Sequence, residues 1–281
     1  MKALTIDEVI SKCEAAGQNH PHHAVSDKYV FLSTQDIIRT LQGHGWHPVR
    51  TNHSYTRNKT YDGYQQHEIT FRLFDSDMTP RGVTDVSNTS KSDNVIPQVL
   101  LVNSHNRSAS FKLFMGLFRV LCSNGLVVSD GIAPSLKIKH IHQNASEVMQ
   151  FVNDMSEEFP KVFDKINDYK SVEPPRDKLI QMVDKALDIR WPKENLRPKF
   201  HPESLLGHID PNKPNDLWQS FNRIQSNLIN GGFSAKSSKG DKNIVVKPIK
   251  AIGTNIKINK GLWDLMDETH QELAQQVHIG V

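Results

Sequence analysis

The chain has few of the residues and patterns on which catalytic and metal sites are usually built. Only two of its 281 residues are cysteine, Cys13 and Cys122, which excludes a disulfide framework. Neither Cys-x-x-Cys nor His-Glu-x-x-His occurs, so the 14 histidines form no recognisable zinc motif. A Gly-x-x-x-x-Gly-Lys phosphate loop and paired carboxylates at motif spacing are also missing. We therefore expect no metal, no cofactor and no catalytic residue.

Long hydrophobic runs are missing as well. No stretch approaches the roughly eighteen apolar residues that a membrane-spanning helix needs. The first ten residues are charged and helix-like, and they lack the apolar segment of a signal peptide. These absences predict a cytoplasmic protein without a membrane partner.

The hydrophobic pattern predicts an α+β fold with strands first and helices later. Residues 46–142 are β-rich, since residues 68–74 alternate with a period of two and residues 98–103 form an apolar run. Residues 109–120 are expected to form a long strand with a bulge at Gly116. We expect a mainly antiparallel sheet packed against the later helices.

Helical spacing of apolar residues dominates from residue 144 onward. One predicted helix runs from a cap at Asn215 and Asp216 to Gly231 and Gly232, and a last helix is expected to start at Asn259. The expected organisation is a β-rich part with N-terminal helices (1–143) and a helical part (144–281) that carries a basic loop (235–258). Together they are expected to form one compact two-lobed unit.

Three blocks of sequence carry a family resemblance. The first begins with the turn Asn103-Ser104-His105 and continues through an apolar run to Arg119, Cys122, Asn124 and Gly125. The second contains Trp218, Gln225, Gly231 and Gly232, and the third spans residues 256–263. In this order they resemble a phage- and plasmid-encoded family known as domain of unknown function 932. The resemblance covers most of residues 28–265 and implies a mobile genetic element in a bacterial host.

The chain departs from the family pattern just after the Asn-Ser-His turn. The resemblance implies His-Asp-Gly-Ser, whereas Asn106 and Arg107 replace the Asp-Gly pair here. Asp-Gly suits a tight turn with positive φ, and arginine is poorer at that position. Arg107 lies at the expected tip of this turn beside serines, which would suit contact with a phosphate.

Arg119 and Cys122 leave two interpretations each. Arg119 lies in an apolar strand, where either an internal carboxylate or a bound anion would have to compensate its charge. Cys122 follows apolar residues, which favours a buried structural thiol, although a nearby cation could lower the pKa of a reactive one.

Basic residues are concentrated in two segments even though the net charge is only +3. One segment interleaves Arg50, Arg57, Lys59 and Arg72 with Tyr55, Tyr61, Tyr64 and Phe71. The other carries Lys236, Lys239, Lys242, Lys247, Lys250, Lys257 and Lys260 against one acid, Asp241. Cations mixed with aromatic rings are what binding of single strands needs. A hairpin with core tyrosines and a solvated lysine-rich loop are the alternative interpretations.

These patterns favour a non-enzymatic nucleic-acid-binding accessory protein of a mobile element, with single-stranded DNA as the favoured partner. The expected architecture is similar in outline to single-strand annealing proteins of recombination, which implies homo-oligomers. One alternative is a protein-interaction module that inhibits a host defence system. Another is a nucleic-acid-processing enzyme with an unrecognised site.

Overall fold

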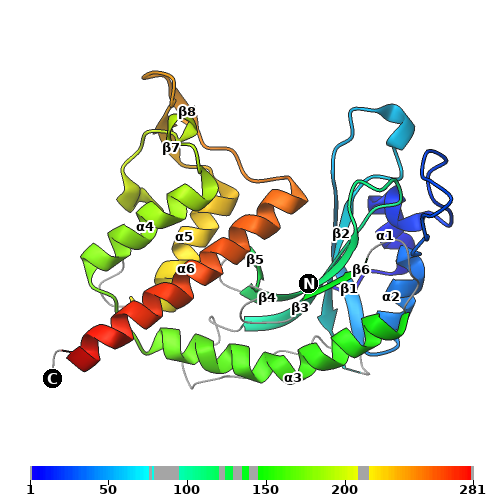
Figure 1. Cartoon of the computed structure of the whole chain (residues 1–281), viewed down its shortest axis with the longest axis horizontal. Coiled ribbons are helices and arrows are strands. Elements are labelled where there is room, and N and C mark those ends of the chain that lie inside the picture. The colour runs from blue at the N-terminus through cyan, green and yellow to red at the C-terminus, as the bar shows by residue number, and fades with distance from the viewer. Residues whose placement is uncertain are drawn as a thin grey trace. The chain divides into compact units, whose positions relative to one another are not determined.

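The computed structural model describes residues 2–75, 78, 95–119, 124–128, 135–138, 145–207 and 215–279 (Figure 1). The chain divides into two compact units, Met1–Pro160 and Lys161–Val281. The border falls inside one long helix, α3 (Ala145–Lys170), which continues through Pro160. The expected boundary at residues 143 and 144 stays a prediction.

The first unit contains an antiparallel sheet, in which β6 pairs with β4 beside a path that runs β1-β2-β3-β4-β5. The strands are β1 (Trp46–His53), β2 (His67–Leu73), β3 (Val95–Asn103), β4 (Phe111–Arg119), β5 (Asn124–Val127) and β6 (Ser135–Ile138). The α+β class and the antiparallel sheet are therefore confirmed. The predicted bulge at Gly116 is wrong, because Gly116 pairs regularly with Gln98, and the irregularity lies in β1 between Pro48 and Arg50.

One face of this sheet forms the apolar core of the first unit. Ile69, Leu101 and Leu113 are register partners on β2, β3 and β4, and all three are fully buried. The helices α1 (Ile6–Lys12) and α2 (Thr34–Gln42) contact β1 and add buried side chains such as Ile38. The hydroxyl of Ser33 caps α2 by accepting a hydrogen bond from the Asp36 amide at 3.2 Å, which is why the helix begins there.

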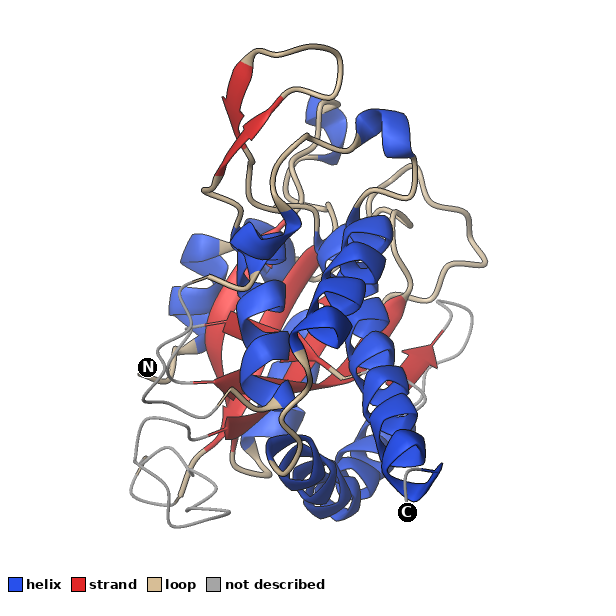
Figure 2. Cartoon of the chain, turned by 90° about the vertical axis from the view of Figure 1, so that its left-hand side faces the viewer, coloured by secondary structure: helices blue, strands red, loops and turns tan. Residues whose placement is uncertain are grey.

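The second unit is built from helices and one small hairpin. Its elements are the end of α3, α4 (Arg176–Arg190), α5 (Leu217–Asn230), β7 (Ser234–Lys236), β8 (Asn243–Val245) and α6 (Ile252–Ile279). The two hairpin strands, red at the top of Figure 2, project beyond the helices of this unit. The last helix begins at Ile252, so the expected start at Asn259 is seven residues too late. None of the helices in the described ranges combines the length and apolar character of a membrane span.

Family residues of the second and third blocks hold this helical unit together. Trp218 of α5 and Trp263 of α6 are fully buried, and their ring centroids lie 5.8 Å apart in an edge-to-face arrangement. Gln225 donates a hydrogen bond of 2.8 Å to the amide oxygen of Asn259, which fixes α5 against α6.

Gly231 ends α5 for a steric reason. Its φ is 62°, and a Cβ added to it would lie 2.3 Å from the carbonyl oxygen of Val246. The next amide, that of Gly232, donates a hydrogen bond of 2.8 Å to the same oxygen. A side chain at Gly231 would therefore separate the helix end from the segment that follows β8.

Candidate functional site

The Asn-Ser-His turn lies in the interior of the first unit. Asn103, Ser104 and His105 are each 0% exposed. The side-chain amide of Asn103 donates to the carbonyl oxygen of Leu32 and to the hydroxyl of Thr34, both at 3.0 Å. Its oxygen accepts from the Ser104 amide at 2.8 Å. Asn103 therefore connects the end of β3 to the start of α2.

The hydroxyl of Thr34 is the centre of a buried hydrogen-bond network. Its oxygen lies 2.9 Å from Nε2 of His67 and 3.2 Å from Nε2 of His105. Nδ1 of His67 faces the carbonyl oxygen of Gln65 at 3.1 Å and must therefore carry a proton. Because burial lowers the pKa of His67 to about 4, the ring is neutral at pH 7 and its Nε2 accepts a hydrogen bond.

This protonation state determines the rest of the network. Thr34 donates its single proton to His67, so its two lone pairs accept from Asn103 and from the Nε2–H of His105. The hydroxyl then makes every hydrogen bond of which it is capable. A network in which each donor has an acceptor favours one arrangement of the chain, which indicates a structural function for these motif residues.

Ser104 is equally engaged in the fold. Its hydroxyl donates to the carbonyl oxygen of Ala109 at 2.8 Å and accepts from the Ala109 amide at 2.9 Å. These two bonds close the turn that connects β3 to β4. The adjacency of Ser104 and His105 therefore serves the turn, and both residues are fully buried.

The second half of the same turn lies at the surface. Arg107 has a φ of 65° and is exposed, and within the described ranges only Met78 is another non-glycine residue with positive φ. The Asn106 side chain accepts from the Ser108 amide at 3.0 Å and stabilises this shape. Arg107 thus occupies a left-handed backbone that suits glycine better, at a cost of roughly 1–2 kcal/mol.

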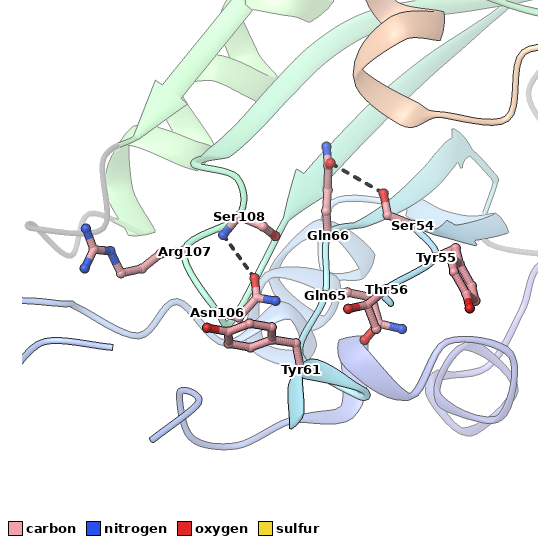
Figure 3. A pocket seen from close by; sticks show the side chains of 9 residues that line it. All are labelled: Ser54, Tyr55, Thr56, Tyr61, Gln65, Gln66, Asn106, Arg107 and Ser108. Atoms are coloured by element: carbon pink, nitrogen blue, oxygen red, sulfur yellow. Dashed lines mark hydrogen bonds between the residues drawn. The ribbon is translucent and has the colours of Figure 1, made fainter. Parts of the chain in front are cut away.

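A pocket of about 320 Å³ lies beside this turn (Figure 3). Three segments line it, and their residues are Ser54, Tyr55, Thr56, Tyr61, Gln65, Gln66, Asn106, Arg107 and Ser108. In Figure 3 the ring of Tyr61 lies beside Asn106, and Arg107 projects from the tip of the turn. The lining contains one cation, two aromatic rings and no acid, so it suits a ligand that is both planar and anionic.

A histidine-containing loop supports the aromatic side of the pocket. The ring of His22 lies 4.7 Å from that of Tyr61 and 5.1 Å from that of Tyr64. Nδ1 of His22 accepts from the Ala24 amide at 3.1 Å, so Nε2 donates to the carbonyl oxygen of Thr60 at 2.7 Å. Sequence reasoning missed this function of His22, because the contact joins residues almost forty positions apart.

The predicted basic and aromatic segment is only partly exposed. Arg50, Arg57 and Lys59 lie at the surface, whereas Tyr61 and Tyr64 are half-buried. Arg72 is 3% exposed, and burial lowers its pKa, which is at odds with contact to a solvent-borne phosphate. Arg50 acts on the buried Glu68, because its charge opposes the increase in the pKa of Glu68 that burial causes.

The remaining predicted residues are dispersed. Lys236, Lys239 and Lys242 are exposed on the β7–β8 hairpin of the second unit, and Lys236 lies 4.0 Å from Asp241. A common face with the Arg50–Arg72 segment stays a prediction. The backbones of Asn124 and Gly125 pair with β4 opposite Arg119 and Phe118. The predicted functions of the Arg119 side chain and of Cys122 lie outside the described residues.

Comparison with known proteins identifies a family and similar proteins of Escherichia coli. UPF0380 protein YafZ of Escherichia coli (strain K12) is 24% identical over 262 residues, which cover 93% of this chain and 90% of YafZ. UPF0380 protein YfjQ of the same organism is 25% identical over 268 residues, which cover 95% and 92%. No solved structure matches the chain significantly. The family model described as domain of unknown function (DUF932) matches residues 21–263, and the chain therefore belongs to this family.

Proposed function

We propose that this protein binds single-stranded nucleic acid, with DNA favoured, as a non-enzymatic accessory factor of a mobile genetic element in the bacterial cytoplasm. The observation that carries the proposal is the pocket beside Arg107. It combines a cation, two tyrosines and amide groups on one surface without a carboxylate. Cationic contacts to phosphates together with stacked bases are the general means by which proteins hold single strands.

The surroundings of the pocket support the same proposal. Arg57 and Lys59 are exposed in the segment that connects Tyr55 to Tyr61, so they extend the positive charge next to the pocket. Tyr55 is 86% exposed, so its ring face is accessible for a base to stack on. The exposed lysines of the β7–β8 hairpin are proposed to add further phosphate contacts.

Salt-dependent binding of a fluorescent single-stranded oligonucleotide tests the proposal. Replacing Arg57 and Lys59 with alanine should weaken binding to all sequences. It should also reduce the slope of log K against log salt concentration by about 0.7 for each phosphate that the variant no longer neutralises. A double replacement of Lys2 and Lys12 is the matched control, because both are exposed and neither lines the pocket. Replacing Lys236, Lys239 and Lys242 together measures the contribution of the hairpin by the same slope.

Stacking is tested at Tyr61 with two substitutions. Tyr61→Ala should cost about 1–3 kcal/mol of binding, whereas Tyr61→Phe should retain most of it, because the ring face survives. Thermal unfolding of both variants checks that the contact with His22 is not the cause. If the wild type binds neither DNA nor RNA at low salt, the proposal fails and a protein-interaction module becomes the better hypothesis.

A further inference from the structure

The pocket beside Arg107 has the size and chemistry of a site for one nucleotide unit. We propose that it binds a nucleoside monophosphate unit whose base carries an exocyclic amino group, as adenine and cytosine do. This inference rests on the proposed function and specifies what one position of the bound strand would place in the pocket. The volume of about 320 Å³ lies at the lower end of the range for small-molecule sites, which suits a single unit.

Asn106 and Arg107 provide the phosphate side of the site. The oxygen of the Asn106 amide is held by the Ser108 backbone, so its NH₂ group is oriented. The described residues offer that NH₂ group no acceptor within hydrogen-bond distance. Arg107 adds a guanidinium on a backbone that arginine adopts only under strain. Strained residues cluster at functional sites, because stability alone would favour glycine at such a position.

Gln65 provides the base side of the site. Its Oε1 atom is shielded from solvent and accepts no hydrogen bond from the described residues. A shielded acceptor without a donor costs about 1–3 kcal/mol, which a ligand donor could recover once the half-buried side chain turns toward the pocket. The amino groups of adenine and cytosine are such donors, whereas thymine presents a carbonyl oxygen at the equivalent position.

Tyr61 places an aromatic surface between these two sides. Its side chain lines the pocket, and its ring is positioned by His22, whose centroid lies 4.7 Å away. In Figure 3 the ring lies beside Asn106, and the Gln65 side chain extends in the other direction. A base against this ring would have its phosphate near the turn, and its edge would reach Gln65 once that side chain turns toward the ring. The three contacts together define a nucleotide, where each alone would fit many ligands.

Calorimetric titration with deoxyadenosine monophosphate (dAMP), thymidine monophosphate (dTMP), deoxyadenosine and inorganic phosphate tests this site directly. We expect dAMP to bind and to displace a single-stranded oligonucleotide. Its affinity should exceed that of dTMP about fivefold, in line with one recovered hydrogen bond. It should exceed the affinities of deoxyadenosine and of phosphate alone about tenfold, because each lacks one half of the contacts.

Arg107→Gly and Lys12→Ala form the matched pair of variants. Arg107→Gly should weaken dAMP binding about tenfold without harming the fold, since glycine adopts the backbone of residue 107 freely. Lys12→Ala removes one positive charge from an exposed residue that does not line the pocket and should leave dAMP binding unchanged. Gln65→Leu should abolish the difference between dAMP and dTMP.

The outcomes separate this inference from the proposed function. An oligonucleotide that binds while dAMP does not would overturn the nucleotide site and leave the proposed function standing. Equal affinities for dAMP and dTMP would overturn the assignment of an amino base to Gln65, and equal affinities for dAMP and deoxyadenosine would overturn the phosphate contact. Absence of both oligonucleotide and nucleotide binding would refute the proposed function and this inference together.

Discussion

Residues 103–108 divide into a buried half (103–105) and a more exposed half (106–108). Residues 103–105 are fully buried and hydrogen-bonded within the fold, whereas Arg107 stands at the surface in a backbone conformation that suits glycine. The departure from the pattern that the resemblance implies, at Asn106 and Arg107, lies in the exposed half. The contrast indicates that residues 103–105 of this chain maintain the fold, while the adjoining turn tip is available for contact with a ligand.

In the helical unit, too, residues that carry the resemblance are buried and stabilise the fold. Trp218, Gln225 and Trp263 belong to the shared blocks, and all three are buried in contacts between α5 and α6. Gly231 has no room for a side chain. The residues that carry the resemblance in this unit therefore serve packing, and we look for a functional surface beside them.

The largest expected effect comes from breaking the buried half at Asn103. Asn103→Ala removes the partners of the Leu32 carbonyl, the Thr34 hydroxyl and the Ser104 amide at once. Since each orphaned buried group costs about 1–3 kcal/mol, we expect a loss of at least about 3 kcal/mol in the free energy of unfolding. Urea denaturation measures it, and a loss below about 1 kcal/mol would show that the network contributes little.

Protonation of His67 is expected to lower the free energy of unfolding by a similar amount. Its folded pKa of about 4 lies below its ordinary value of 6.5, so the unfolded chain binds more protons between these two pH values. Stability is therefore fully present above pH ~6.5 and falls as the pH approaches ~4, by about 3 kcal/mol in total. Glu68 acts in the opposite direction, because burial raises its pKa and the folded state takes up its proton first.

Unfolding free energies of the wild type and of His67→Gln across this pH range separate the two contributions. The variant should be less stable at neutral pH and should lack the part of the slope that His67 causes. Its Glu68 contribution should remain. Identical slopes in both proteins would mean that His67 takes up its proton without opposing the fold.

The division between buried and exposed residues also explains what the sequence could predict. Period-two alternation identified β2 and helical spacing identified α5, because a buried face imposes its period on the chain. The apolar run at residues 98–103 identified β3. The cap at Asp216 and the stop at Gly231 were recognisable from local chemistry. The positive φ at Arg107 was not predicted, since the sequence showed only that arginine replaces a glycine implied by the resemblance.

The candidate site was less predictable because it depends on contacts between distant segments. Arg72 matched the basic and aromatic pattern as well as Arg57 did, yet the sheet buries one and leaves the other at the surface. The pocket joins Tyr61 to Asn106 through the pairing of β2 with β3, which local composition does not encode. Likewise, the partners of Thr34 lie 33 and 71 residues away.

The smallest expected effect, and the most direct test of the comparison, concerns Arg107. Arg107→Ala removes the charge but keeps a side chain in the left-handed backbone, whereas Arg107→Gly removes both the charge and the strain. We therefore expect the alanine variant to match the wild type in thermal stability and the glycine variant to be about 1 kcal/mol more stable. Both should bind single-stranded DNA less tightly than the wild type, and to a similar degree.

A glycine variant that is more stable but binds more weakly would show that the chain maintains a strained residue for binding. If Arg107→Gly is instead no more stable than Arg107→Ala, the backbone at the turn tip is not strained, and the contrast between the two halves reduces to burial alone.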